Sequence, residues 1–110
     1  MLFCITANYT PQALNAMREN PSTNRQQAIE QLLAAAGGKL VSMYGTIAEG
    51  PGVLAIIDVE PAVVNSIVGV VTMAGAIHNV RLQRLFSQDE LVGIRQKARE
   101  LHGSYKAPGQ

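Results

Sequence analysis

The 110-residue sequence has no tryptophan, a single cysteine and few charged residues. Charged residues make up 15% of the chain and leave a net charge of +1, so there is no strong positive patch for nucleic acid or for an anionic membrane. The single Cys4 excludes an intramolecular disulfide and any multi-cysteine metal site, and it fits a reducing compartment. We therefore expect neither a nucleic-acid partner nor a membrane partner.

A targeting segment is also missing from the start of the sequence. Residues 1–8 have no basic leader and no long apolar run, so we expect neither a signal peptide nor an anchor and predict a soluble cytoplasmic protein. What the chain does have is an apolar fraction of 47%, in a length that suits one domain with one core. We predict that this domain spans residues 1–102 and that residues 103–110 form a flexible tail.

Four strands are predicted, and the middle two dominate the pattern. Residues 37–58 read as a strand, a tight turn and a second strand, because their apolar residues are largely β-branched and suit a half-buried sheet. The Gly-Pro-Gly segment at residues 50–52 supplies the chain reversal. Alternating apolar residues predict further strands over residues 2–8 and residues 77–86.

Helix signals lie between and after these strands. A Thr-Pro pair at residues 10–11 opens a short helix, an apolar stripe at residues 29–36 marks a second, and a Glu-Pro pair at residues 60–61 opens a third. Ser87 and Glu90 have the spacing of a capping box, which begins the last helix. The solvent side of the second helix is expected to carry four polar residues: Arg25, Gln26, Glu30 and Gln31.

The third predicted helix, residues 61–74, is apolar around most of its circumference. Its many β-branched residues leave a buried strand pair as an alternative, but Pro61 at the start and the small residues inside favour a helix. A helix of this kind must be buried on nearly all sides, which one small domain cannot achieve. We therefore expect a homo-oligomer, either a dimer or a multiple of dimers.

The order of the elements predicts an α+β fold of the ferredoxin-like split βαβ type, a four-stranded antiparallel sheet with helices on one face. The other face is mixed in character, because it would carry Thr6, Asn8, Ser42 and Tyr44. In this topology the first strand lies between the third and the fourth and runs antiparallel to the fourth. The end of the first strand and the start of the fourth therefore meet at one edge of the sheet.

The segment Gly-Gly-Lys-Leu-Val-Ser-Met-Tyr at residues 37–44 is similar to the Gly-Gly-Lys-Leu-x-Ser-x-Tyr stretch of the small bacterial GYD-domain proteins. The opening strand with its Thr-Pro pair, Val-Leu-Ala-Ile-Ile at residues 53–57, and the segment from Asn-Val-Arg to Phe-Ser at residues 79–87 also resemble that family, over about residues 3–101. The resemblance implies a ferredoxin-like domain that associates through its sheets, as in dimeric α/β barrels, and no established activity. The Gly-Tyr-Asp triplet that names the family is replaced here by Ala-Glu-Gly-Pro-Gly at residues 48–52, so no residue role is carried over from it.

Polar residues that the topology gathers at one edge of the sheet are the candidate ligand site. A small-molecule site needs polar groups that converge over an apolar floor. A tyrosine hydroxyl can orient a ligand oxygen, and a histidine can transfer a proton near neutral pH or simply bond a neighbouring loop. The predicted ligand-binding residues are Asn8, Tyr9, Tyr44, His78, Asn79 and Arg81.

Other polar features favour structural roles. Cys4 lies in an apolar strand with no base nearby in sequence, so it is expected to be a small buried hydrophobe and not a nucleophile. No group of histidine and acidic residues has the spacing of a metal site, and the Gly-Pro-Gly turn lacks the Lys-Ser/Thr of a phosphate loop. No metal is predicted, and the cofactor is left unassigned.

The predicted function is therefore small-ligand binding by an oligomeric domain, with the substrate unassigned. One alternative is an assembly module whose apolar helix and mixed sheet face are only interfaces. Another is a cofactor-independent enzyme of the dimeric α/β-barrel type, by analogy at the level of the fold. A closed pocket containing Tyr44 and His78 would favour a ligand, and a solid interior would favour the module.

Overall fold

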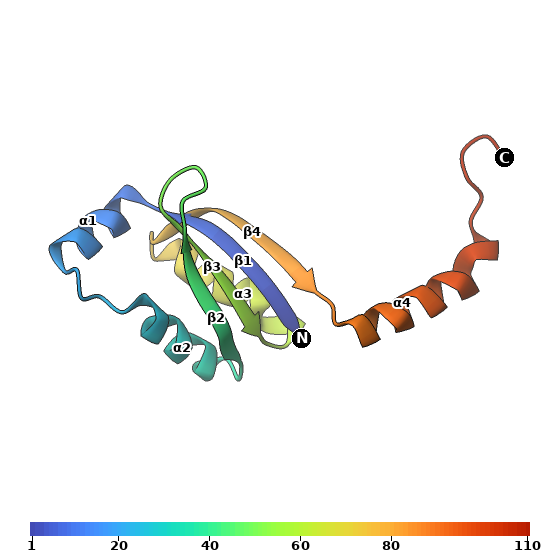
Figure 1. Cartoon of the computed structure of the whole chain (residues 1–110), viewed down its shortest axis with the longest axis horizontal. Coiled ribbons are helices and arrows are strands. Elements are labelled where there is room, and N and C mark those ends of the chain that lie inside the picture. Colours follow the sequence, from blue (N-terminus) through green and yellow to red (C-terminus); the bar gives the residue numbers. More distant parts are fainter.

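A computed structural model describes all 110 residues as a twisted four-stranded antiparallel sheet with helices on one face, the predicted α+β arrangement (Figure 1). The strands follow the order β2-β3-β1-β4, so β1 lies between β3 and β4 as the split βαβ topology requires. The strands are β1 (Leu2–Tyr9), β2 (Lys39–Thr46), β3 (Gly52–Asp58) and β4 (Ile77–Leu85). The helices are α1 (Pro11–Glu19), α2 (Arg25–Ala35), α3 (Pro61–Met73) and α4 (Gln88–Leu101), followed by the short 3-10 helix η1 (His102–Ser104).

The predicted helix boundaries are confirmed by their caps. The Thr10 hydroxyl oxygen accepts a hydrogen bond from the Ala13 N–H at 3.1 Å, and the hydroxyl donates to the Gly75 carbonyl at 2.6 Å. This one side chain therefore starts α1 and also joins it to the loop before β4. Gly37 and Gly75, which follow α2 and α3, both have φ of +78°, the left-handed conformation that glycine adopts at low cost.

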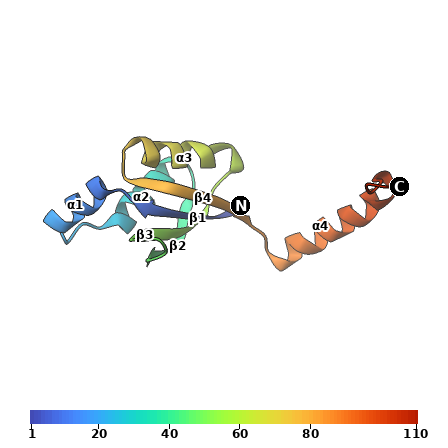
Figure 2. The same cartoon turned by 90° about the horizontal axis from the view of Figure 1, so that it is seen from above.

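Segment 61–73 is a helix, as favoured over the strand pair, but the chain covers only one side of it. Val64 and Ile67 are buried against the sheet, whereas the side chains of Val70 and Met73 are 49% and 82% exposed. Figure 2 shows α3 lying along one side of the sheet. The burial that this apolar helix requires is thus incomplete in one copy of the chain.

The core lies between the sheet and helices α2 and α3. Alternate residues of the central strands β1 and β3 face these helices, as expected from the two-residue period of a strand. Only 12 of 110 residues are buried, and only Leu33 and Ile57 fall below 2% exposure, so the core is small for this length. Its members are Phe3, Leu33, Ala55, Ile57, Val59, Val64 and Ile67.

The opposite face of the sheet, called the open face below, has no helix packed on it. Register pairs Cys4 with Ile56 and Thr6 with Leu54, which puts apolar and polar side chains together on this face. The predicted mixed character of the face is therefore confirmed. Its members include Cys4, Thr6, Asn8, Ser42, Tyr44, Leu54, Ile56, Arg81 and Gln83.

Helix α4 stands apart from the rest of the chain. It continues outward beyond the end of β4 in both views (Figures 1 and 2), and the molecule is 61 Å long although only 33 Å and 22 Å across. None of its residues is buried. An apolar stripe is nevertheless present on it, made of Leu91, Ile94, Ala98 and Leu101.

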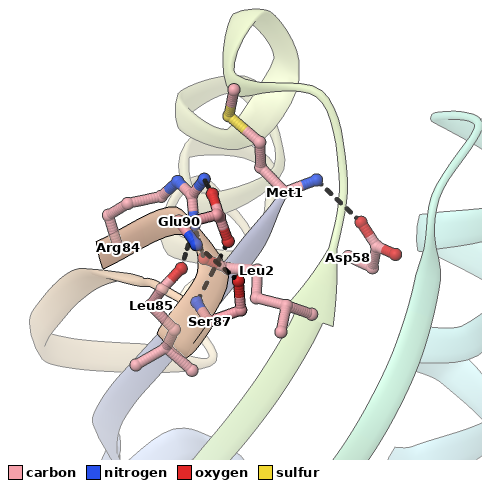
Figure 3. Close-up of polar contacts among 7 residues, drawn as sticks. All are labelled: Met1, Leu2, Asp58, Arg84, Leu85, Ser87 and Glu90. Carbon is pink, nitrogen blue, oxygen red and sulfur yellow. Dashed lines mark hydrogen bonds and ion pairs between the residues drawn. The ribbon is translucent and has the colours of Figure 1, made fainter. Parts of the chain in front are cut away.

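Polar contacts fix the junction between the sheet and α4 (Figure 3). Glu90 accepts the Ser87 N–H at 3.1 Å while the Glu90 N–H donates to the Ser87 hydroxyl at 3.1 Å, which is the predicted capping box. Arg84 donates to the backbone carbonyls of Leu2 and Leu85. On the neighbouring strand, the Met1 amino group lies 2.9 Å from the carboxylate of Asp58.

Candidate functional site

A polar hollow of about 510 Å³ lies on the open face, at the end of the sheet where β1 finishes and β4 begins. It brings together Asn8, Asn79 and Arg81, three of the six residues predicted as ligand-binding. Thr46 and Glu49, which the sequence did not suggest, also line it, because the β2–β3 hairpin folds over this end of the sheet. The hollow is lined by Thr6, Ala7, Asn8, Thr46, Ala48, Glu49, Leu54, Asn79, Val80 and Arg81.

Asn8 and Asn79 are joined by a hydrogen bond in the lining of the hollow. Asn79 has φ of +54° at a bulge in β4, a left-handed conformation that asparagine tolerates better than most residues. The Asn79 side-chain amide donates to the side-chain oxygen Oδ1 of Asn8 at 3.5 Å, and the Asn8 side-chain amide in turn donates to the backbone carbonyl of Ala48 at 3.0 Å. The two side chains thus tie β4, β1 and the hairpin loop together. The Asn8 amide is committed to the loop, whereas the side-chain oxygen of Asn79 accepts no hydrogen bond within the protein.

His78 and Tyr44 lie close to this hollow without lining it. His78 is paired in register with Asn8, so the predicted meeting of these residues at one edge of the sheet is confirmed, and its side chain is exposed. Tyr44 is paired with Leu54 on the open face and is 60% exposed. The structure therefore contains no closed pocket with both Tyr44 and His78 in its lining.

A second, apolar pocket lies on the other side of the sheet, beneath α2 and α3. It contains about 60 Å³ of space, several times what one water molecule needs by the same measure, about 10–15 Å³. Twelve of its 13 lining residues are hydrophobic, so it suits an apolar group better than water. The lining comes from all four strands and both helices: Ile5, Tyr9, Arg25, Ile29, Leu33, Met43, Val53, Ala55, Ile57, Ile67, Val68, Val71 and Ile77.

Two side chains of the apolar pocket have hydrogen-bonding groups: Arg25, and Tyr9, which is among the twelve hydrophobic residues but has a hydroxyl. Tyr9 was predicted to join Asn8 at a common site, but it lies on the opposite face, because it continues the alternation of Phe3, Ile5 and Ala7. Arg25 was assigned to the solvent side of its helix, and this was wrong. It is half-buried because it lies four residues before Ile29 and so shares the inner face of α2.

Two carboxyl groups with lowered pKa values lie at the far end of the sheet from the hollow. A hydrogen bond from the amino group of Met1 lowers the pKa of Asp58, and the Ser87 N–H followed by the Arg84 guanidinium lowers the pKa of Glu90. These structural partners account for the lowered pKa values of both carboxyl groups. Neither residue lines the hollow or the apolar pocket.

Comparison with known proteins identifies the family. The family model of the GYD domain matches residues 3–94, which is most of the chain. The match covers all four strands except Leu2, helices α1 to α3, and the first part of α4. The chain belongs to the GYD-domain family. No curated protein matches it. In this GYD domain, the hairpin turn that lacks the Gly-Tyr-Asp triplet has two consecutive residues with positive φ, Glu49 at 58° and Gly50 at 117°.

No helix in the structure combines the length and apolar character needed to cross a bilayer.

Proposed function

We propose that this chain is a self-associating domain that binds a small molecule in the apolar pocket between its sheet and its helices. The observation that supports this most directly is an unfilled apolar space whose lining includes Tyr9 and Arg25, two side chains that belong to no ion pair of the protein. A concave apolar lining with a few convergent polar groups is the usual form of a ligand site. A pocket needed only for packing would be filled by side chains, since protein interiors contain few voids of this size.

Self-association is supported by the apolar surface that one chain leaves uncovered. Helix α3 exposes Val70 and Met73, and α4 has an apolar stripe but no buried residue. A helix as short as α4 is marginal in water unless its apolar face packs against something. In a two-fold dimer each copy offers the same surface to the other, so the open face and α4 of both chains would be covered reciprocally. Helix α3 lies on the other side of the sheet, so covering Val70 and Met73 requires a second interface, as in a multiple of dimers.

The polar hollow is the second candidate binding site for a ligand. Asn8, Asn79 and Arg81 meet there, and the left-handed backbone of Asn79 is of the kind that often accompanies functional sites. A second copy packed on the open face would close the hollow over a polar molecule. We rank it below the apolar pocket because Asn8 already bonds the hairpin and Asn79.

Two other functions make different predictions about these cavities. A pure assembly module would leave the apolar pocket empty in every preparation and would show only the oligomer. A cofactor-independent enzyme would convert the bound molecule, so a product would accumulate when the ligand is incubated with the protein. Both behaviours are measured in the experiment that tests ligand binding.

The test is native mass spectrometry of freshly purified protein. The expected spectrum shows a dimer, or a multiple of dimers, with a small molecule retained in each chain. Replacing Val68, which lines the pocket from α3, by phenylalanine should fill the space and remove that molecule. Ser66→Phe, on an exposed position of the same helix, is the matched control and should retain it. Retention in both variants would place the ligand elsewhere, and an empty protein that also fails a library screen would contradict ligand binding.

A further inference from the structure

The ligand class follows from the two polar groups of the apolar pocket, an inference that rests on the function proposed above. We propose that the pocket takes a small carboxylic acid as its anion, with the alkyl or aryl part inside and the carboxylate on Arg25 and Tyr9. The polar lining consists of these two side chains alone, and no acidic residue lines the pocket.

Arg25 is a half-buried cation without an acidic partner. The ion pairs of the protein are Met1–Asp58, Arg84–Glu90 and Lys97–Glu100, and Arg25 belongs to none of them. No buried side-chain nitrogen or oxygen of the protein lacks a partner, so the guanidinium reaches solvent while its stem is partly covered. A guanidinium that is free of any carboxylate of the protein is available to pair with a carboxylate from a ligand.

The position of Arg25 suits the head group of an amphiphile. It lines both the apolar pocket and a wider groove of about 510 Å³ between α1, α2 and the end of α3. Ile29 and Val71 also line both the pocket and the groove. The groove is more polar, with Gln12, Asn20 and Thr23 in its lining. The guanidinium therefore lies at the boundary between the apolar pocket and the more polar groove. A ligand that enters the pocket from the groove would contact it.

The chemistry of the two groups selects an anion with acceptor oxygens. Arginine offers only donors, in a planar fork that matches the two oxygens of a carboxylate. The Tyr9 hydroxyl is a second donor from the end of β1, with its backbone held by a bond from the Tyr9 N–H to the Pro51 carbonyl at 3.0 Å. Arg25 is also the first residue of α2, where the positive end of the helix dipole favours negative charge.

The size of the pocket limits the apolar part of the ligand. A space of about 60 Å³ within a lining of Val, Ile, Leu and Met side chains accepts a short chain or a single ring and not a long acyl chain, unless the rest lies in the outer groove. Hexanoate and 1-hexanol are therefore suitable probes, because they share the apolar part and differ in the charged head.

The test is calorimetric titration of the full chain with hexanoate and with 1-hexanol at pH 7. Hexanoate should bind at least about tenfold more tightly, because only its carboxylate brings a negative charge to the guanidinium. Arg25→Gln should abolish that difference and leave the affinity for 1-hexanol unchanged, Arg25→Lys should retain part of it, and Tyr9→Phe should weaken only hexanoate. Arg18→Gln, an exposed arginine of α1 with the same change in charge, is the control and should alter neither affinity.

The outcomes separate this inference from the function on which it rests. If both probes bind equally and Arg25→Gln changes nothing, Arg25 merely covers apolar surface with its alkyl stem, and the carboxylate class is overturned while the pocket stands. If neither probe binds and Val68→Phe has no effect on any retained molecule, the pocket itself is overturned as a ligand site.

Discussion

Glu90 and Arg84 form an ion pair across the turn between β4 and α4, with a guanidinium nitrogen 2.6 Å from a carboxylate oxygen. The other oxygen of Glu90 accepts the Ser87 N–H, so one side chain closes the capping box and also anchors the helix to the sheet. The Arg84 guanidinium lies over the ring of Phe86, 4.5 Å from its centroid. These contacts set the direction of α4, a helix with no buried residue of its own.

The first prediction concerns the pH dependence of α4. The pKa of Glu90 is lowered in the folded protein below its ordinary value of 4.5, because the ionised form accepts the Ser87 N–H and pairs with Arg84. Its contribution is therefore fully present above pH 4.5 and is lost as the pH falls through the lowered pKa. NMR chemical shifts of α4 should report this loss of helix in the original protein. In Glu90→Gln, α4 should be less helical at pH 7, and the loss of helix on acidification should no longer be observed.

The matched control for that experiment is Glu100→Gln. Glu100 pairs with Lys97 at 3.3 Å on the same helix, but both side chains are about two-thirds exposed and neither takes part in the cap. Exposed pairs of this kind contribute little. An acid transition that survives in Glu90→Gln, or that disappears in Glu100→Gln, would contradict the assignment to Glu90.

The second prediction concerns α4 and the oligomer. Deleting residues 88–110 should leave a folded sheet domain, because α4 contributes no buried residue, and should shift the protein toward monomer. Sedimentation velocity gives the state and thermal denaturation gives the fold. Deletion of residues 103–110 alone is the control and should preserve the oligomer. An original protein that sediments as an 11.8 kDa monomer at micromolar concentration would overturn self-association.

The third prediction concerns the glycine at the start of β3. A Cβ atom on Gly52 would lie 2.4 Å from the Ala7 carbonyl oxygen and 2.8 Å from the Thr46 hydroxyl, so backbone would have to move. Gly52→Ala should destabilise the domain by about 1–3 kcal/mol, the range for overpacking a closed site. Gly45→Ala in the neighbouring strand meets nothing nearer than 3.9 Å and should remain close to the original stability. Urea denaturation measures both, and equal stabilities would show that β3 relaxes without cost.

Much of the fold was predictable because its signals are local. The caps at Thr10 and Ser87, the left-handed stops at Gly37 and Gly75, and the alternation of the strands each depend on a few neighbouring residues. Strand order then followed from the sequence of elements, which placed Asn8 beside His78.

The candidate site was harder to predict because it depends on which face each side chain takes. The i, i+4 spacing of Arg25 and Ile29 places both on the inner face of α2, but Arg25 was expected to face solvent because it is charged. The bulge at Asn79 shifts the register of β4, and alternation alone does not reveal such a shift. The apolar stripe of α4 predicts a helix but not what covers it, since periodicity describes only one partner of an interface.

The fourth prediction concerns Cys4. Its side chain is buried at 9% exposure in the central strand β1, as expected for a small hydrophobe, and it is a free thiol. Alkylation of the native protein at neutral pH should therefore be slow and should accelerate on unfolding in urea, because reagents cannot reach the sulfur in the folded state. Mass spectrometry of timed samples gives both rates. Rapid labelling of the native protein would instead make Cys4 a candidate nucleophile.

The last prediction distinguishes between the two proposed ligand-binding sites, the polar hollow and the apolar pocket. Glu49 and Arg81 line the polar hollow, and both side chains are exposed. If the molecule retained in native mass spectrometry occupies the hollow, Glu49→Gln and Arg81→Gln should change its binding, because each removes a charge from the lining. Both should keep the free energy of unfolding within about 1 kcal/mol of the original, as for most exposed substitutions. If it occupies the apolar pocket, these variants should bind it normally while Val68→Phe does not, because that pocket opens on the other side of the sheet. Unchanged binding in all three variants would place the molecule outside both proposed sites of this GYD domain.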